Sequence, residues 1–210
     1  MTKIKITTTD LSPTAAQMPR IMGLGLASKL FREDKNLHQF TTLSNKGNEI
    51  VFGTIGDGST SEGIFLEAIN AMGVLQIPVV MSVWDDGHAI SVPVEKQTTK
   101  GSISEALKGF VKENGSNGIE ILKARGWNYP ELCAAYDKAA KIARKTHTPV
   151  LVHVVELTQP QGHSTSGSHE RYKSKDRLAW EKEYDCTVQF KKWIIENSWA
   201  SEEELEEVHK

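Results

Sequence analysis

The stretch that decides the fold is EIVFGTIGDGSTSEGIFLEAINAMGVLQIPVVMSVWDDG, at residues 49–87. It holds a short apolar run at residues 49–55, an amphipathic segment at 60–75 and a second apolar run at 77–84. Short apolar runs bounded by turn residues predict buried strands, and apolar residues spaced by three and four predict a helix. The unit is therefore typical of a strand, a helix and a second strand parallel to the first.

The same alternation continues along the chain. Further helices are predicted at residues 13–31, 103–112 and 129–145, and further strands at residues 118–124 and 149–156. Strands alternating with helices predict an α/β fold with a parallel sheet covered by helices on both faces. We expect this α/β domain at residues 1–175, and a charged C-terminal helical extension of the same domain at residues 176–210.

The composition narrows the possible partners. A length of 210 residues is enough for one domain with a substantial core. The net charge of -2 gives no basic surplus for nucleic acid, and no apolar stretch is long enough to cross a bilayer. Two cysteines far apart in the sequence predict reduced thiols, and Met1 is followed by a polar run. We therefore expect a cytoplasmic protein that binds neither nucleic acid nor membranes.

The triplet Gly56-Asp57-Gly58 follows the first predicted strand, and hydroxyl residues beginning with Ser59 open the next helix. Glycines allow close approach of a ligand, and the free N–H groups of a helix start attract anions such as phosphate. The carboxylate of Asp57 would repel phosphate unless a divalent cation bridges the two. This pattern favours a phosphate site that includes a metal ion.

A second acidic turn, Asp85-Asp86, follows the next predicted strand. A right-handed crossover places successive parallel strands side by side, so their carboxyl ends share the edge where open α/β sheets bind ligands. Asp57 and Asp86 can therefore meet around one metal ion. The triplet alone is common in solvated turns. The combination of strand, triplet, capped helix, second strand and acidic turn is what favours a metal site here. Of the seven histidines, His153 lies in an apolar strand and is expected in the core, whereas His163 lies in a polar loop.

Three stretches resemble one family, the alpha chains of 2-oxo acid dehydrogenases. GDGSTSEGIFLEAINAMGVLQIPVVMSVWDDGHAISVP, at residues 56–93, is similar to the thiamine-diphosphate motif of that decarboxylating component. LSPTAAQMPRIMGLGLA, at residues 11–27, is similar to the S-P-x-A-x-Q segment, and GHSTSGSHERYKS, at residues 162–174, to the H-S-T-S active-site loop. The resemblance implies the thiamine-diphosphate-binding fold and an oxidoreductase acting on a 2-oxo acid, with a branched-chain substrate favoured over pyruvate.

The resemblance also implies roles for individual residues, with thiamine diphosphate and Mg²⁺ as cofactors. The metal ligands would be the carboxylates of Asp57 and Asp86 and the backbone carbonyl of His88. His163 would be the catalytic residue, in substrate handling and acyl transfer. The cofactor-binding residues would be Ser12 and Thr14 in the cofactor cleft, and Gly56, Gly58, Ser59 and Ser164 near the diphosphate.

Several residues depart from the family pattern. Asp85-Asp86 replaces a pair of asparagines, which adds repulsion toward the diphosphate. His88 stands where the family has Tyr, and Thr14 where it often has an apolar residue that helps to bend the cofactor. Residues 159–162, QPQG, replace a segment that often carries Arg and a second His, so this segment lacks a diphosphate-binding charge of the family.

The resemblance implies that the thiamine-diphosphate- and metal-binding domain at residues 1–175 is truncated at its N-terminus, because the family has a long segment before the S-P-x-A-x-Q motif. It implies partners as well. No residue matches the glutamate that activates the aminopyrimidine, so it would come from a beta portion, either a separate chain or a later part of a longer polypeptide. We expect a homodimer or heterotetramer, a lipoyl-bearing acyltransferase as a further partner, and no turnover by the isolated chain. Two alternatives remain. One is a transketolase, which the H-S-T-S loop and residues 89–91 argue against. The other is a non-catalytic anion- or nucleotide-binding module, which the lack of Walker-type and G-x-G-x-x-G sequences argues against.

Overall fold

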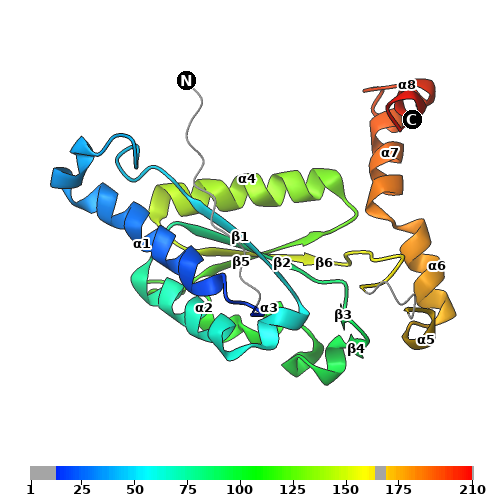
Figure 1. Ribbon diagram of the computed structural model, residues 1–210, viewed down its shortest axis with the longest axis horizontal. Coiled ribbons are helices and arrows are strands. Elements are labelled where there is room, and N and C mark those ends of the chain that lie inside the picture. The colour runs from blue at the N-terminus through cyan, green and yellow to red at the C-terminus, as the bar shows by residue number, and fades with distance from the viewer. Residues whose placement is uncertain (1–12, 164–168, 210) are drawn as a thin grey trace.

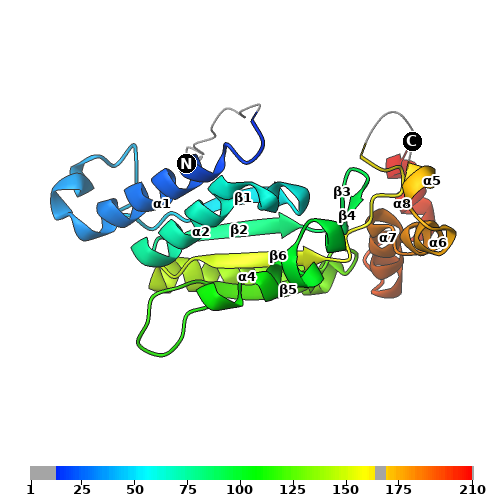
Figure 2. The same ribbon diagram turned by 90° about the horizontal axis from the view of Figure 1, so that it is seen from below.

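The computed structural model describes residues 13–163 and 169–209, which form a parallel sheet with helices and a helical tail (Figure 1). The four strands of the parallel sheet are β1 (Val51–Gly56), β2 (Val79–Trp84), β5 (Glu120–Arg125) and β6 (Val150–Val155). They are all parallel, in the order β1-β2-β6-β5 (Figure 2). The sheet thus confirms the expected α/β architecture.

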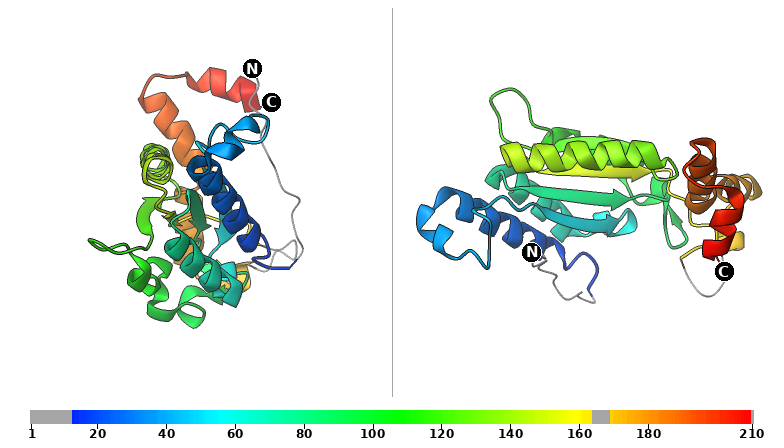
Figure 3. Two further views of the ribbon diagram at one scale, coloured as in Figure 1. Left: turned by 90° about the vertical axis from the view of Figure 1, so that its left-hand side faces the viewer. Right: turned by 90° about the horizontal axis from the view of Figure 1, so that it is seen from above.

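Helices cover both faces of this sheet, as Figure 3 shows. Helix α4 (Tyr129–Thr146) lies on one face, and α1 (Met18–Glu33) and α2 (Gly63–Leu75) lie on the other. Along the strand order β1-β2-β6-β5, the step from β1 to β2 runs in the opposite direction to the step from β5 to β6. Because each crossover is right-handed, the two connecting helices must lie on opposite faces.

Each face of the sheet has its own hydrophobic core. Successive side chains of a strand point to opposite faces, so β2 contributes Val79 and Met81 to one core and Val80 to the other. The first core includes Phe65 and Ile69 of α2, and the second packs against α4. The central strands β2 and β6 are buried on both faces, which explains the apolar runs from which they were predicted.

Several elements begin or end away from the predicted positions. Helix α1 starts at Met18, after a turn in which Ala15 has a φ of 62°. The helix expected at residues 60–75 is divided into the 3₁₀ turn η2 (Gly58–Ser61) and α2. The helix expected at 103–112 is also shorter, as α3 (Ile103–Ala106) is followed by the 3₁₀ turn η5 (Lys108–Phe110). Gly109, within η5, lowers the helix propensity there.

The long segment after β2 contains short regular elements rather than a plain loop. Two two-residue strands, β3 (His88–Ala89) and β4 (Val92–Pro93), pair antiparallel. The 3₁₀ turns η3 (Val94–Lys96) and η4 (Thr99–Gly101) follow in the same segment, and another, η1 (Lys35–Gln39), lies between α1 and β1. The hairpin brings Ala89 against η2, so it fixes one wall of the site described below.

The C-terminal tail lies beyond the carboxyl ends of the strands (Figures 1 and 2). It consists of α5 (His169–Tyr172), α6 (Lys175–Glu183), α7 (Cys186–Glu196) and α8 (Glu202–His209). Aromatic contacts attach it to the start of α4, where the Tyr129 ring lies 4.5 Å from that of Phe190 and 5.1 Å from that of Trp193. The division at residue 175 stays a prediction. Among the helices of the described residues, none is long and apolar enough to cross a membrane.

Candidate metal and cofactor site

Two acidic turns meet at the carboxyl edge of the sheet. Gly56 and Trp84 are register partners at the ends of β1 and β2, and the backbone N–H of Asp57 donates to the Trp84 carbonyl at 3.0 Å. This pairing places Asp57 beside the Asp85-Asp86 turn, at the edge where open α/β sheets bind ligands. The strand register therefore brings the two predicted carboxylate ligands to neighbouring positions.

Both carboxylates are buried with an unsatisfied oxygen. Asp57 is 3% exposed and Asp86 is 4% exposed. Within the described residues, Oδ2 of each has no hydrogen-bond donor. A buried carboxylate oxygen without a partner is energetically unfavourable, and such oxygens are hard ligands of the kind that divalent cations bind. The two orphaned oxygens fit a cation between the turns.

The charge around Asp57 also fits a cation. Burial, followed by the charges of Asp85 and Asp86, raises the pKa of Asp57 from 3.8 to about 7. A hydrogen bond from the backbone N–H of Gly58 acts in the opposite direction but is outweighed. A divalent cation would favour the ionised carboxylate and so lower this pKa again.

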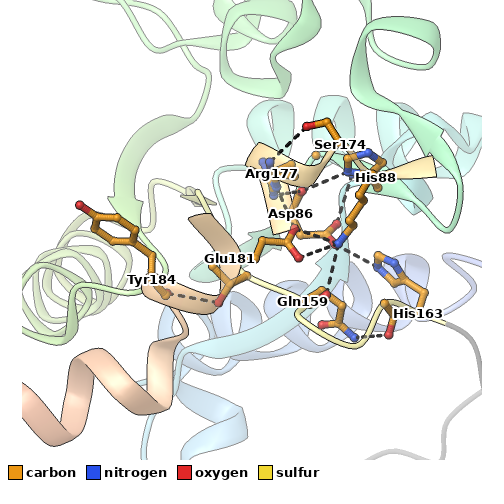
Figure 4. Close-up of polar contacts among 12 residues, drawn as sticks. Asp86, His88, Gln159, His163, Ser174, Arg177, Glu181 and Tyr184 are labelled. Carbon is orange, nitrogen blue, oxygen red and sulfur yellow. Dashed lines mark hydrogen bonds and ion pairs between the residues drawn. The ribbon is translucent and has the colours of Figure 1, made fainter. Parts of the chain in front are cut away.

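Asp86 is the centre of the polar contacts drawn in Figure 4. Its Oδ1 accepts a hydrogen bond from the backbone N–H of His88 at 3.2 Å, and its carbonyl accepts one from Nη2 of Arg177 at 2.7 Å. Nε2 of His163 lies 3.5 Å from its Oδ2, which permits an ion pair with protonated His163 but no hydrogen bond. The structure therefore brings the predicted catalytic histidine to the predicted metal turn.

The glycines of the triplet have different surroundings. A Cβ at Gly58 would lie 2.7 Å from Cβ of Ala89, whereas the same position at Gly56 has no atom within 4 Å. Gly58 is therefore required for close packing against the β3–β4 hairpin, and its missing side chain does not open a path for a ligand. Gly56 leaves open space at the end of β1.

The expected hydroxyl cap of the following helix is absent from the described residues. The N-cap of α2 is Glu62, without a side-chain hydrogen bond. Oγ1 of Thr60 donates instead to the Asp57 carbonyl at 2.6 Å, and Nε2 of Gln97 donates to the same carbonyl at 3.0 Å. The chain makes a 3₁₀ turn before α2 begins. The Thr60 hydroxyl and the Gln97 amide therefore fix the Asp57 turn and do not cap the helix.

Of the other predicted site residues, the structure describes Thr14 and Ser59. Thr14 is exposed in the turn before α1. From the same turn, Nε2 of Gln17 donates to the Thr54 carbonyl in β1 at 3.1 Å, which fixes the turn near the carboxyl half of that strand. Ser59 lies in η2, next to the Asp57 turn. Ser12 and Ser164 fall outside the described residues.

The side chains that the structure describes do not form a complete metal cage. Across residues 13–163 and 169–209, no group of three or more His, Cys, Asp and Glu side chains is arranged to hold a metal ion. The predicted set has only two carboxylates and one backbone carbonyl, so cofactor oxygens or water would have to complete it. Mg²⁺ is commonly bound in this way, through one or two carboxylates together with phosphate oxygens and water.

Sequence reasoning missed the group that holds the acidic turn. Nε2 of His153 lies 2.7 Å from Oδ2 of Asp85, and its Nδ1 lies 2.5 Å from Oγ of Ser104. His153 is therefore a hydrogen-bonded core residue, as expected, but its partner was not foreseen. Parallel pairing sets His153 opposite Val83 on β2, and this register follows from the strand order, which the sequence alone does not give.

Comparison with known proteins identifies the family of the chain. The family described as "Dehydrogenase E1 component" matches residues 1–210. The chain is 32% identical over 207 residues to the 2-oxoisovalerate dehydrogenase subunit alpha of Caenorhabditis elegans, covering 96% of this chain and 42% of that protein. It is 29% identical over 195 residues to 2-oxoisovalerate dehydrogenase subunit alpha 1 of Arabidopsis thaliana, covering 92% and 36%.

A bacterial relative is named for a different substrate, pyruvate. The chain is 28% identical over 193 residues to the pyruvate dehydrogenase E1 component subunit alpha of Rickettsia bellii, covering 92% of this chain and 52% of that protein. The chain thus spans about half or less of the length of these relatives. The match of the whole chain to the family shows that it belongs to the dehydrogenase E1 component family, among the alpha subunits of 2-oxo acid dehydrogenases.

Proposed function

We propose that this chain binds thiamine diphosphate through a divalent cation, as the alpha portion of a 2-oxo acid dehydrogenase. One observation carries the proposal: Oδ2 of Asp57 and Oδ2 of Asp86 are buried, lack a hydrogen-bond donor within the described residues, and belong to neighbouring turns. The backbone carbonyl of His88 would be the third ligand. Mg²⁺ fits this set of oxygen ligands.

The diphosphate would lie near the open position beside Gly56 and the backbone of Ser59. Close packing of Gly58 on Ala89 leaves only the backbone of Gly58 available to it. When bound, thiamine diphosphate supplies the stabilisation of the carbanion left by decarboxylation. The residues of this chain would bind the cation, orient the diphosphate, and hold a proton on Nε2 of His163 at the rim of the site.

The reaction would be the oxidative decarboxylation of a 2-oxo acid. Relatives named for pyruvate and for 2-oxoisovalerate both match, and the Ser-Glu-Gly that ends at Gly63 favours a branched-chain substrate. Because the relatives are named as alpha subunits, we propose that the chain needs a beta portion and does not turn over alone. The further partners that we propose are a second copy of the chain and a lipoyl-bearing acyltransferase.

Calorimetry on the purified chain tests the cofactor assignment. Thiamine diphosphate would be titrated with MgCl₂ and again with EDTA, and ATP and NAD would be titrated under the same conditions. We expect saturable binding of thiamine diphosphate only with Mg²⁺, and none by Asp57→Asn. Asp137→Asn, which removes an exposed carboxylate of α4, is the matched control and should bind like the parent. Equal binding with EDTA, or preferential binding of ATP or NAD, would show that the assignment is wrong.

A further inference from the structure

We propose that three residues, Lys173, Arg177 and Glu181, act as positioning residues for the candidate site. We call them the α6 clasp, because Arg177 and Glu181 lie on α6 and Lys173 lies two residues before its start. The inference rests on the proposed function and adds a task to it. The clasp closes the loop that carries His163 and holds the Asp86 turn.

The centre of the clasp is a fully buried ion pair. Nζ of Lys173 lies 2.8 Å from Oε1 and 2.9 Å from Oε2 of Glu181, and both side chains are 0% exposed. The ammonium group donates a third hydrogen bond to the Gln159 carbonyl at 3.2 Å. Since an ammonium group has three protons, every donor of Lys173 is used.

The third hydrogen bond of Lys173 closes a loop. Gln159 and Lys173 lie on either side of the segment that contains His163, and they are 14 residues apart. Nε2 of Gln159 also donates to the Gly162 carbonyl at 3.2 Å, directly before His163. The buried pair thus attaches Gln159, four residues before His163, to Lys173, and we expect this contact to restrict the positions that the imidazole can adopt relative to Asp86.

Arg177 connects the same pair to the acidic turn, as Figure 4 shows. Its Nε lies 2.8 Å from Oε1 of Glu181, and its Nη2 donates to the Asp86 carbonyl at 2.7 Å. Its guanidinium also lies over the Trp180 ring, 4.8 Å from the centroid. Each end of the guanidinium therefore has a fixed partner, so the Asp86 turn is attached to α6.

Charge gives a second reason for this arrangement. The clasp carries two positive groups and one negative group, which leaves one net positive charge beside a turn region with three carboxylates, Asp57, Asp85 and Asp86. A diphosphate would add further negative charge there. The clasp thus reduces repulsion within the site, and residues 159–162 carry no charged side chain that could do so.

Stability alone does not account for a buried pair at this position. Replacing such a pair with apolar residues of similar volume is often neutral or stabilising, whereas removing one partner leaves an uncompensated buried charge. The double variant Lys173→Met/Glu181→Leu should therefore keep the fold while it removes the hydrogen bonds to Gln159 and Arg177. This allows a positioning role to be separated from a role in folding.

The test combines hydrogen exchange with calorimetry on the 210-residue chain. In Lys173→Met/Glu181→Leu, the backbone amides at positions 162 and 173 should exchange at least about tenfold faster than in the parent. The variant should also bind thiamine diphosphate with Mg²⁺ at least about tenfold more weakly, as is found when residues that orient metal ligands are changed. Its melting temperature should remain close to that of the parent. Lys182→Met/Glu183→Leu, which changes two exposed positions of α6, is the matched control and should change neither measurement.

Arg177→Met is the second variant, because it keeps the buried pair and so does not depend on the double variant folding. It should weaken cofactor binding but leave the amides of Gly162 and Lys173 protected. Unchanged exchange in a folded double variant, or unchanged affinity in Arg177→Met, would overturn the inference. If the parent binds no cofactor, the proposed function fails, and faster exchange in the double variant would still support loop closure by the clasp.

Discussion

Asp57→Asn should stabilise the cofactor-free chain above pH 7 and abolish its response to the cofactor. The substitution keeps the shape of the side chain but removes a buried negative charge that faces Asp85 and Asp86. Without a cation, that charge opposes folding. With a cation and diphosphate, the same charge becomes a ligand, so the variant should lose binding while it gains stability.

The magnitude follows from the pKa of Asp57. Its shift from 3.8 to about 7 corresponds to at most about 4 kcal/mol, because each pKa unit is about 1.4 kcal/mol. We expect about 2 kcal/mol, since the neighbouring turns can relax and solvent screens part of the repulsion. In a chain of this length, that difference raises the melting temperature by about 4–8 °C.

The sign of the pH dependence is fixed by the direction of the shift. The folded pKa lies above the unfolded value, so the folded chain holds the extra proton between about pH 4 and 7. The parent therefore loses stability as the pH rises through this window, and Asp57→Asn does not show this loss. The advantage of the variant should be close to zero at pH 4 and greatest above pH 7.

Differential scanning calorimetry at pH 4, 6 and 8 measures this effect, with Asp137→Asn as the control at an exposed carboxylate. Adding Mg²⁺ and thiamine diphosphate at about 100 times the dissociation constant should stabilise the parent by about 2.7 kcal/mol at pH 8 and leave Asp57→Asn unchanged. A lower melting temperature of the variant at pH 8 without ligand would refute the reasoning, because it would mean that the Asp57 carboxylate stabilises the apo chain.

Three other substitutions test separate parts of the site. Asp86→Asn should keep or improve the calorimetric affinity for thiamine diphosphate with Mg²⁺, because it restores the asparagine of the family pattern while the Asp57 carboxylate remains as a ligand; a large loss would show that the Asp86 carboxylate itself is required. His163→Ala, assayed with the beta portion, should lower turnover strongly with little change in melting temperature, whereas destabilisation with normal activity would assign it a structural role. His153→Ala leaves Asp85 without its buried partner and should cost about 3 kcal/mol in chemical denaturation, and a near-neutral result would contradict the anchoring of the turn.

The sheet and its covering helices were predictable because their signals are local. Apolar runs and helical spacing place β1, α2 and β2 within a few residues of their observed bounds. The start of α2 was missed, because the 3₁₀ turn at Gly58–Ser61 depends on packing of the glycine against Ala89. Short tertiary contacts of this kind leave no periodic pattern in the sequence.

The candidate site was predictable only in part, for the same reason. Asp57 and Asp86 follow strands, so the topology of a parallel sheet is enough to bring them together. Asp85 bonds to His153 across the sheet, and Arg177 reaches Asp86 across 91 residues. Contacts between distant segments depend on strand order and on the docking of the tail, which the sequence alone does not specify.

A crystal structure with thiamine diphosphate and Mn²⁺ in place of Mg²⁺ tests the central claim most directly. The anomalous signal of Mn²⁺ marks the cation without reference to the surrounding atoms. We predict one peak bound by the carboxylates of Asp57 and Asp86 and by the His88 carbonyl, at about 2.0–2.2 Å, with the diphosphate completing the coordination. An ordered cofactor whose cation lies elsewhere, with Asp57 and Asp86 free of metal, would contradict the account.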